Sequence, residues 1–434
     1  MQKVVLLVVA LLISLTSANA FDAREVISPG GIKAWLVEDH TIPLVAMNFS
    51  LQGGAATDPA GKEGRAHFMA SMLNEGAGDM DGPSFQSRTD ELAIRMGFSA
   101  NTDTFQVWLQ TLTVNRAEAA RLLKLALSSP TFPPDATDRV RRQIVVGARN
   151  AATDPGTIAW ARAAAFAIPG HPYGRATNGN EASIGAITRD DLVEVHKLLI
   201  RRTGLTVSAV GDITANELGA MLDDVFGTLP ATDLPSPAAN VKVKDGPYLE
   251  VFDFDNPQTL VLFGQPGISD SDPDYIPAVV MMELLGGSSS QAWLGNEVRE
   301  KRGLTYGIQF DLQVLPHTAF LAGSFSTSNE TAAEALAVVR QTIKRMAEVG
   351  PTQAELDDIK TYMTGSYPLR FDSTNAISSF LTGIQLTNRP ITYANERNGL
   401  IEKVTLDQVK DVAKRLLKPD KLIVVAVGKP VGVK

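Results

Sequence analysis

Five histidines and the absence of cysteine limit the chemistry that this chain can perform. The histidines are His40, His67, His171, His196 and His317. Without cysteine the chain forms no disulfide, no thiolate-bound zinc, no iron–sulfur cluster and no thiol nucleophile. Any metal site or general base that depends on histidine must therefore use one of these five.

His67 lies in a segment whose residues repeat with helical spacing. Residues 64–77 read Gly-Arg-Ala-His-Phe-Met-Ala-Ser-Met-Leu-Asn-Glu-Gly-Ala, which places His67, Ala70 and Ser71 on one stripe of a helix. Two histidines at positions i and i+4 of a helix can hold one zinc ion, and a glutamate beside them can activate the metal-bound water. Alanine has no proton acceptor and serine is a poor zinc ligand, so this stripe lacks most of that chemistry. The apolar stripe of the same helix consists of Phe68, Met69, Met72 and Leu73.

A second candidate segment lies in the other half of the chain. Residues 286–290 form a small-residue loop, Gly-Gly-Ser-Ser-Ser, and residues 296–306 read Asn-Glu-Val-Arg-Glu-Lys-Arg-Gly-Leu-Thr-Tyr. Arg299 and Tyr306 are seven positions apart in this segment. A guanidinium and a phenol can both donate hydrogen bonds where negative charge develops in a reaction. The alternative is structural, with Arg299 at a solvated helix end and Tyr306 in the core of a strand.

Both segments resemble the pitrilysin/insulinase family of zinc metallopeptidases, which carries the inverted motif His-x-x-Glu-His in its first domain. On this resemblance the first zinc ligand matches His67, the general base falls on Ala70 and the second ligand falls on Ser71. The third ligand, a glutamate in a later helix, falls at Ala148. The resemblance therefore implies a degenerate zinc site and no metal bound by this chain. We interpret His67 as a partly buried histidine with local hydrogen bonds, and expect Glu75, more than about two helical turns away, to be too distant to replace the base.

The second segment resembles the family's second-domain signature, a glycine-rich turn followed by Arg-Glu-Lys-Arg-Gly-Leu-x-Tyr. The resemblance implies that Arg299 and Tyr306 bind the substrate backbone and the oxyanion, and that Gly286 and Gly287 belong to the substrate loop. In the two-subunit, mitochondrial processing peptidase-like branch, one subunit carries zinc and the other has lost it. This chain is similar to the subunit without zinc.

Three functional hypotheses follow from the resemblance. The first is a non-catalytic, substrate-binding subunit that forms a heterodimer with a zinc-bearing paralogous subunit and supplies Arg299 and Tyr306 to the partner's active site. The second is a pseudopeptidase that acts as a binding or scaffold protein without proteolysis, and the third is an independent peptidase with an unusual metal site. Retention of Arg299 and Tyr306 favours the first. Its substrate is expected to be a peptide or unfolded polypeptide that adds as a strand to a sheet edge.

The other histidines offer no metal-ligand spacing. His171 begins a His-Pro-Tyr-Gly run that resembles a loop of the same family, and we expect it to fix a turn. His40, His196 and His317 are expected to be surface residues or to have local partners, and Arg302 to be a surface or structural residue.

The two halves of the chain repeat the same landmarks. A segment opened by Thr188 leads to an expected strand at 205–210 and Gly211, and one opened by Thr405 leads, over the same distance, to a strand at 422–427 and Gly428. Four pairs have capping-box spacing, the first of them the weakest: Thr188–Asp191, Thr214–Glu217, Thr352–Glu355 and Thr405–Gln408. The duplication predicts an α+β fold of two similar α/β sandwich domains, with mostly antiparallel sheets and helices packed on one face.

Composition and the first residues indicate where the chain works. Apolar residues make up 44% and the formal net charge is −8, which excludes a strongly basic nucleic-acid surface and predicts a globular protein. Residues 1–20 have a positive start, an apolar run and small residues before a predicted cleavage after Ala20, as in a secretory signal peptide. We expect export, to the periplasm in a host with two membranes, and no transmembrane segment after signal removal.

The expected domains follow from the duplication and from the prolines between the halves. Residues 21–228 form the N-terminal peptidase-like domain with the degenerate zinc site. Residues 229–246 form a proline-rich linker, and residues 247–434 form the C-terminal peptidase-like domain with the Arg299/Tyr306 motif.

Overall fold

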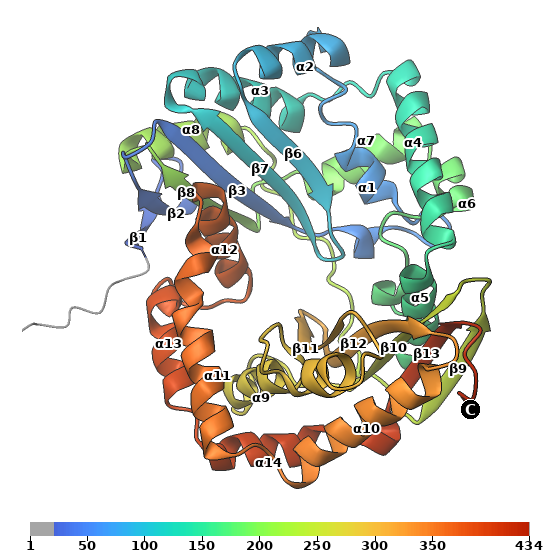
Figure 1. Ribbon diagram of the computed structural model, residues 1–434. Coiled ribbons are helices and arrows are strands. Elements are labelled where there is room, and N and C mark those ends of the chain that lie inside the picture. Colours follow the sequence, from blue (N-terminus) through green and yellow to red (C-terminus); the bar gives the residue numbers. More distant parts are fainter. Residues whose placement is uncertain (1–20, 434) are drawn as a thin grey trace, which may run out of the picture.

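The computed structural model describes residues 21–433, so the predicted signal peptide lies outside the described residues. Within residues 21–433 the strands form two large sheets and a short two-stranded ribbon. One large sheet lies in each half of the chain, and helices surround both (Figure 1). The arrangement confirms the predicted α+β fold with mostly antiparallel sheets.

The first sheet has six strands in the order β1-β2-β8-β3-β7-β6. Its neighbouring strands are antiparallel except for β2 and β8, which run parallel. The bounds are β1 (Ala23–Ile27), β2 (Lys33–Glu38), β3 (Leu44–Gln52), β6 (Arg95–Ala100), β7 (Thr104–Leu112) and β8 (Leu205–Gly211), with β4 (Gly76–Ala77) and β5 (Met80–Asp81) forming the ribbon.

The second sheet repeats this plan without the first edge strand. Its order is β9-β13-β10-β12-β11, again with a single parallel pair, β9 with β13, among the described strands. The matching order in the two sheets is the structural counterpart of the repeat seen in the sequence. The bounds are β9 (Tyr248–Asp253), β10 (Gln258–Pro266), β11 (Ile308–Leu315), β12 (Thr318–Ser328) and β13 (Ile423–Gly428).

The helices begin where the sequence predicted caps. The predicted capping boxes at Thr188, Thr214, Thr352 and Thr405 all form and open α7, α8, α11 and α14. In the first half the helices are α1 (Arg65–Ala70), α2 (Gly82–Glu91), α3 (Arg116–Ser128), α4 (Pro134–Ala152), α5 (Pro155–Ala167), α6 (Glu181–Ala186), α7 (Arg189–Leu199) and α8 (Ala215–Phe226). In the second half they are α9 (Tyr275–Gly286), α10 (Ala332–Glu348), α11 (Gln353–Gly365), α12 (Thr374–Leu386), α13 (Tyr393–Glu402) and α14 (Leu406–Leu416). The short turns are η1 (Ala55–Thr57), η2 (Thr113–Asn115), η3 (Pro172–Gly174), η4 (Gly295–Glu300), η5 (Tyr367–Phe371) and η6 (Pro419–Lys421).

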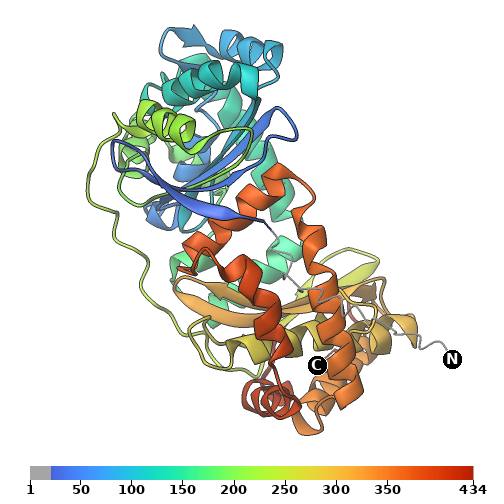
Figure 2. The ribbon, with the colours of Figure 1, turned by 90° about the vertical axis from the view of Figure 1, so that its left-hand side faces the viewer.

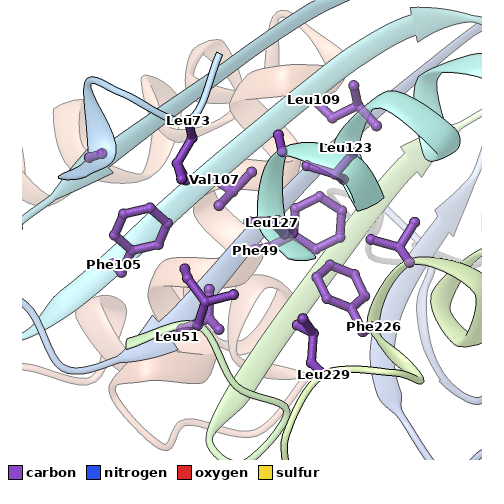
Figure 3. Close-up of a cluster of buried hydrophobic side chains, with 14 of the residues drawn as sticks. Phe49, Leu51, Leu73, Phe105, Val107, Leu109, Leu123, Leu127, Phe226 and Leu229 are labelled. Carbon is purple, nitrogen blue, oxygen red and sulfur yellow. The ribbon is translucent and has the colours of Figure 1, made fainter. Parts of the chain in front are cut away.

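Each half has an apolar core between one sheet face and its own helices. In the first half, alternate residues of β3 and β7, such as Phe49 and Val107, point into a cluster with Leu123 of α3 and Phe226 of α8 (Figure 3). The second core joins β10 and β12 to α9, α10 and α14 in the same way. The period-two alternation of the central strands therefore sets the position of both cores.

The opposite face of each sheet is covered by a helix from the other half. Helix α12 of the second half packs on β3 and β8, and α5 of the first half packs on β13 and β10 (Figure 1). The prediction placed helices on one face only, because it treated each half by itself. The exchange covers both sheets and ties the halves together.

Residues 229–246 contain no helix or strand and run from one half to the other along the side of the molecule (Figure 2). This segment is attached at several points, since Val241 N donates to His317 O at 2.9 Å and Lys244 N donates to Ala167 O at 3.0 Å. In the part of the chain that the structure describes, no helix is both long enough and apolar enough to cross a bilayer.

Candidate functional site

A buried carboxylate fixes the start of α1, the helix that carries His67. Asp58 accepts hydrogen bonds from Gly64 N at 2.9 Å and from Ala66 N at 3.1 Å. Gly64 has φ 90°, a left-handed conformation that favours glycine, and leads directly into the helix. Burial raises the pKa of Asp58 to about 6, although Arg65 lies nearby and opposes the shift. The scaffold for a helical motif is thus intact.

The helix is shorter than the sequence pattern suggests. It ends at Ala70, and Ser71 is its C-cap residue, with the chain then turning through residues 72–75. The premise that Glu75 continues along this helix was wrong, since the turn places Glu75 on the lining of the same cavity as His67. Its carboxylate accepts a hydrogen bond from Arg139 of α4, so one of its oxygens already has a partner.

The sequence-predicted zinc-site residues meet around one cavity, with one exception. His67, Ser71 and Ala148 line a cavity of about 560 Å³ between α1, α4 and the start of α5. Ala70 lies instead in the first apolar core, where it is 2% exposed. Of the stripe that the sequence predicted, His67 and Ser71 therefore line the cavity, whereas the methyl group of Ala70 packs in the core. The remaining lining residues are Glu75, Val140, Gln143, Ile144, Gly147, Ala151, Thr157, Ala176, Thr177, Asn178 and Gly179.

His67 itself makes no side-chain hydrogen bond within residues 21–433, so the expected local hydrogen bonds to its ring were wrong. Its backbone carbonyl, in contrast, accepts a bond from Ser71 Oγ at 3.0 Å. Burial lowers the pKa of His67, which keeps the imidazole neutral near pH 7. The ring thus faces the cavity with one donor and one acceptor nitrogen unused.

These residues do not fit a zinc ion. The positions that would supply the other donors hold methyl groups at Ala70 and Ala148 and a hydroxyl at Ser71 that is bonded to the helix backbone. Within residues 21–433, no three histidine, aspartate or glutamate side chains are grouped closely enough to hold a metal ion. One imidazole alone is too weak a ligand set for structural or catalytic zinc.

The second candidate site is a cavity of about 630 Å³ beside the edge of the second sheet. Arg299, Tyr306 and Gly287 line it together, so the structure brings together three of the four predicted residues. Gly286 is buried at the end of α9, where an added methyl would lie 2.6 Å from Phe310 Cβ, and it serves packing rather than the cavity wall. The rest of the lining is rich in small polar residues: Gln258, Leu260, Ser288, Ser289, Ser290, Gly295, Glu300, Thr305, Gly307, Ile308, Gln309, Ser324, Phe325 and Ser326.

Arg299 and Tyr306 are both accessible from solvent. Tyr306 is 93% exposed, which excludes the structural alternative of a strand-core tyrosine. The Arg299 side chain is half exposed, and its Nε donates to Glu300 Oε1 at 2.8 Å. Arg299 lies in η4, a π-helical turn, and such turns occur often at functional sites.

Glu297 anchors η4 to the body of the second half. Its carboxylate is 11% exposed and accepts bonds from Lys301 at 2.9 Å, Arg302 at 2.7 Å and Arg345 at 3.2 Å. The hydrogen bond from Lys301 and then that from Arg302 lower the pKa of Glu297 to about 2. Arg302 is therefore a structural residue, as predicted. Sequence reasoning did not identify Glu297, although its spacing to Lys301 is that of a helical ion pair.

The first turn of α5 lies against lining residues of both cavities. Thr157 lines the first cavity and Leu260 lines the second. A methyl group on Gly156 would lie 3.9 Å from Leu260 Cδ1 and 3.2 Å from Asp154 Oδ2. The exchanged helix thus borders the first cavity through Thr157 and approaches Leu260 of the second.

The remaining histidines have local partners, as predicted. His171 Nδ1 accepts from Tyr173 N at 3.2 Å and caps η3, so it fixes a turn. His196 contacts Leu127 O at 2.8 Å, and His317 Nδ1 lies 3.0 Å from Asn240 Oδ1. His40 is held between Asp212 and Glu38 at the surface.

Comparisons with known proteins find similarity to M16 peptidases and their inactive relatives. The family model described as "Peptidase M16 inactive domain" matches residues 186–363, which include the Arg299/Tyr306 segment. A crystal structure of a peptidase M16 inactive domain from Pseudomonas fluorescens is similar, with a TM-score of 0.88, 27% identity, and coverage of 95% of this chain and 99% of that chain.

Two curated proteins are similar over most of their length. A Helicobacter pylori protein named "Non-peptidase homolog YmxG" is 26% identical over 386 residues, which cover 87% of each protein. A Schizosaccharomyces pombe protein named "Probable mitochondrial-processing peptidase subunit beta" is 23% identical over 398 residues, covering 87% of this chain and 85% of that protein.

Proposed function

Because the chain belongs to the M16 peptidase family and lacks that family's zinc motif, we propose that it is the substrate-binding subunit of a heterodimeric zinc metallopeptidase. As a non-catalytic member of the family, it needs a zinc-bearing paralogous subunit for peptide hydrolysis. The observation that carries the proposal is the second cavity, which both Arg299 and Tyr306 line and in which Tyr306 is 93% exposed. A fully exposed tyrosine beside a half-exposed arginine has no packing role of its own.

The chemistry proposed for this cavity is electrostatic. A zinc ion held by the partner subunit would supply the activated water, and this chain would supply donors to the peptide. The Tyr306 hydroxyl donates to the oxyanion that forms at the scissile carbonyl, and the Arg299 guanidinium binds the neighbouring backbone carbonyl. Before substrate arrives, Glu300 holds Arg299, but an exposed ion pair is worth only about 0–1 kcal/mol and gives way to a better acceptor.

The substrate proposed is a peptide or unfolded polypeptide. The lining of the second cavity is mostly glycine, serine and threonine, which leaves room for a main chain and imposes little selection on large side chains. The edge strand β11 borders the cavity through Ile308 and Gln309, so an extended segment can add to it as a strand. We propose that this takes place outside the cytoplasm, in the periplasm of a host with two membranes, after removal of residues 1–20.

A second candidate function is binding or scaffolding without proteolysis. The resemblance to a protein named a non-peptidase homolog favours it, as does the bond from Arg299 to Glu300. A scaffold needs no donor aimed at a reacting carbonyl, so the two functions differ in whether the Tyr306 hydroxyl affects peptide cleavage.

Reconstitution tests the proposal. The mature chain is co-expressed with a paralogue from the same genome that has an intact His-x-x-Glu-His motif, and sedimentation and peptide cleavage are measured. We expect a stable pair at micromolar concentration and cleavage that requires both chains and is abolished by a chelator. Two independent monomers, or cleavage by the paralogue alone at the same rate, would favour the scaffold function.

A further inference from the structure

The first cavity keeps hydrogen-bonding groups that nothing in the chain uses. The half-buried His67 and the exposed residues Gln143 and Asn178 line it, and none of these side chains has a hydrogen-bond partner within residues 21–433. Each carries at least one donor and one acceptor when neutral. Loss of the zinc chemistry has therefore not closed this cavity or filled it with apolar side chains.

The free groups of this cavity are uncharged. The imidazole of His67 is neutral because burial lowers its pKa. The one acidic lining side chain, Glu75, is bound by Arg139, so its charge is already balanced. The cavity wall formed by α4 is apolar at Val140 and Ile144. A ligand with both a donor and an acceptor, no net charge and some apolar surface fits such a lining, and a peptide group with a small side chain has these properties.

The position of the cavity points to one peptide for both sites. Gly156 precedes Thr157, which lines the first cavity, and a methyl group on Gly156 would be in contact with Leu260, which lines the second. An extended chain rises about 3.3 Å per residue, so a few residues suffice to pass the first turn of α5. The Ala-rich helix α5 thus separates two sites that a single polypeptide can occupy.

We propose that the degenerate zinc cavity is a second peptide subsite, in which His67, Gln143 and Asn178 bind an uncharged segment of the polypeptide that also occupies the Arg299/Tyr306 cavity. This inference rests on the proposed function for the identity of the ligand as a peptide. It assigns to His67 a binding role in place of the metal role that the residue has lost.

The test measures peptide binding by the full mature chain, without a partner subunit, by fluorescence anisotropy. The probe is a labelled neutral peptide of about 14 residues built from Ser, Asn, Ala and Leu, which spans roughly 45 Å when extended. Each half of this peptide serves as a short probe. The variants are His67→Ala, His67→Gln, Ala148→Leu and Gly156→Phe, with Gly185→Phe as the control, because no atom lies within 4 Å of a methyl group built there.

We expect His67→Ala to weaken binding of the long peptide about two- to tenfold, the range for one neutral hydrogen bond. His67→Gln should restore binding, since the amide is also a neutral donor and acceptor. Ala148→Leu places a larger side chain of α4 in the cavity and should weaken binding of the long peptide at least as much as His67→Ala does. Gly156→Phe should reduce the affinity for the long peptide to that for the short ones, because its ring would occupy space beside Thr157 of the first cavity and Leu260 of the second, where the proposed peptide would cross α5. Gly185→Phe should bind as the unaltered chain does.

Two outcomes overturn the inference and are distinct from failure of the proposed function. If Arg299→Ala weakens binding but the His67, Ala148 and Gly156 variants bind as the unaltered chain does, the second cavity alone binds peptide and the proposed function survives. If the unaltered chain binds neither the long nor the short probe, this subsite does not exist in the chain. The proposed function is then still judged by reconstitution. Thermal melting of every variant separates loss of binding from loss of folding.

Discussion

The two cavities lie in halves built on one strand order, yet they differ in what their side chains can do. The cavity of the first half presents neutral groups around His67, whereas that of the second presents a cation and an exposed phenol, Arg299 and Tyr306. The scaffold of the first has not decayed, since Asp58 still holds the start of α1 by two backbone hydrogen bonds. The backbone fold around a site can therefore persist while its reactive side chains change. A few side chains decide whether such a site catalyses a reaction, binds a ligand or does neither.

The two sites also differ in how they are anchored. Asp58 accepts from backbone N–H groups in a buried place, and its pKa is raised to about 6. Glu297 accepts from three cationic side chains, and its pKa is lowered to about 2. Ionisation of Asp58 therefore lowers the free energy of unfolding, whereas ionisation of Glu297 raises it. The contrast shows that a buried carboxylate stabilises only when charge compensates its desolvation.

The largest effect is expected when the first site is made to resemble an active one. Ala70→Glu, alone or with Ser71→His and Ala148→Glu, should destabilise the chain by about 3–5 kcal/mol, because position 70 is in the apolar core and a carboxylate there has no partner. Urea unfolding measures the loss. Ser71→His alone is the control and should cost less than about 1 kcal/mol, since Ser71 is only half-buried. Equal stability of Ala70→Glu and the unaltered chain would place residue 70 on the cavity wall.

The next largest effect concerns the second site. In the reconstituted pair, Tyr306→Phe and Arg299→Lys should each lower turnover about 100- to 1000-fold, roughly 2.7–4 kcal/mol, because they remove a donor to charge that develops in the transition state. Steady-state kinetics checks this, and gel filtration checks assembly. Tyr362→Phe is the control, an exposed tyrosine that does not line the cavity, although its hydroxyl lies 3.4 Å from Oγ of the lining residue Ser288. Wild-type turnover by both variants would leave the scaffold function as the better account.

A smaller effect distinguishes the two anchoring carboxylates by pH. Since the pKa of Glu297 is lowered to about 2 from 4.5, its contribution is complete above about pH 4.5 and disappears as the pH falls towards 2. Glu297→Gln should therefore cost about 1–3 kcal/mol at pH 7 and progressively less in acid. Denaturant unfolding from pH 7 to 3 measures the difference, and a cost that stays constant over this range would contradict the assignment.

Asp58 should behave in the opposite way. Its folded pKa of about 6 lies above the ordinary value of 3.8, so the folded state holds the proton more tightly and its contribution falls as the pH rises from about 4 to 6. Asp58→Asn should remove this decline while keeping an acceptor for one of the two backbone N–H groups. Parallel pH–stability curves for Asp58→Asn and the unaltered chain would show that Asp58 ionises normally.

The smallest effect is expected from zinc. Equimolar zinc should change the melting temperature by less than about 1 °C, because a ligand that does not bind the folded state does not stabilise it. Metal analysis after gel filtration should find no stoichiometric zinc in the isolated chain. One firmly held zinc ion per chain, lost in His67→Ala, would mean that the first cavity is still a metal site.

Local features of the sequence predicted most of the elements and one of the sites. The capping boxes at Thr188, Thr214, Thr352 and Thr405 formed as expected, because a cap involves residues three positions apart. The Arg299/Tyr306 cavity was predictable for a similar reason, since both residues lie in one short segment. The position of Glu75 on the lining of the first cavity was not predictable. It depends on where α1 ends and on the contact with Arg139, which is far away in the sequence.

What the sequence by itself determined is the repeated plan of strands and helices and the identity of the missing donors at Ala70, Ser71 and Ala148. Both follow from residue types and short spacings, which can be read from the sequence without knowledge of tertiary contacts. Only the tertiary structure decided that α5 and α12 exchange sheets, that Ala70 packs in the core, and that the first turn of α5 lies close to Leu260 of the second cavity. These features arise from contacts between residues far apart in the chain. Their geometry depends on how the two halves pack against each other, which no local sequence pattern predicts.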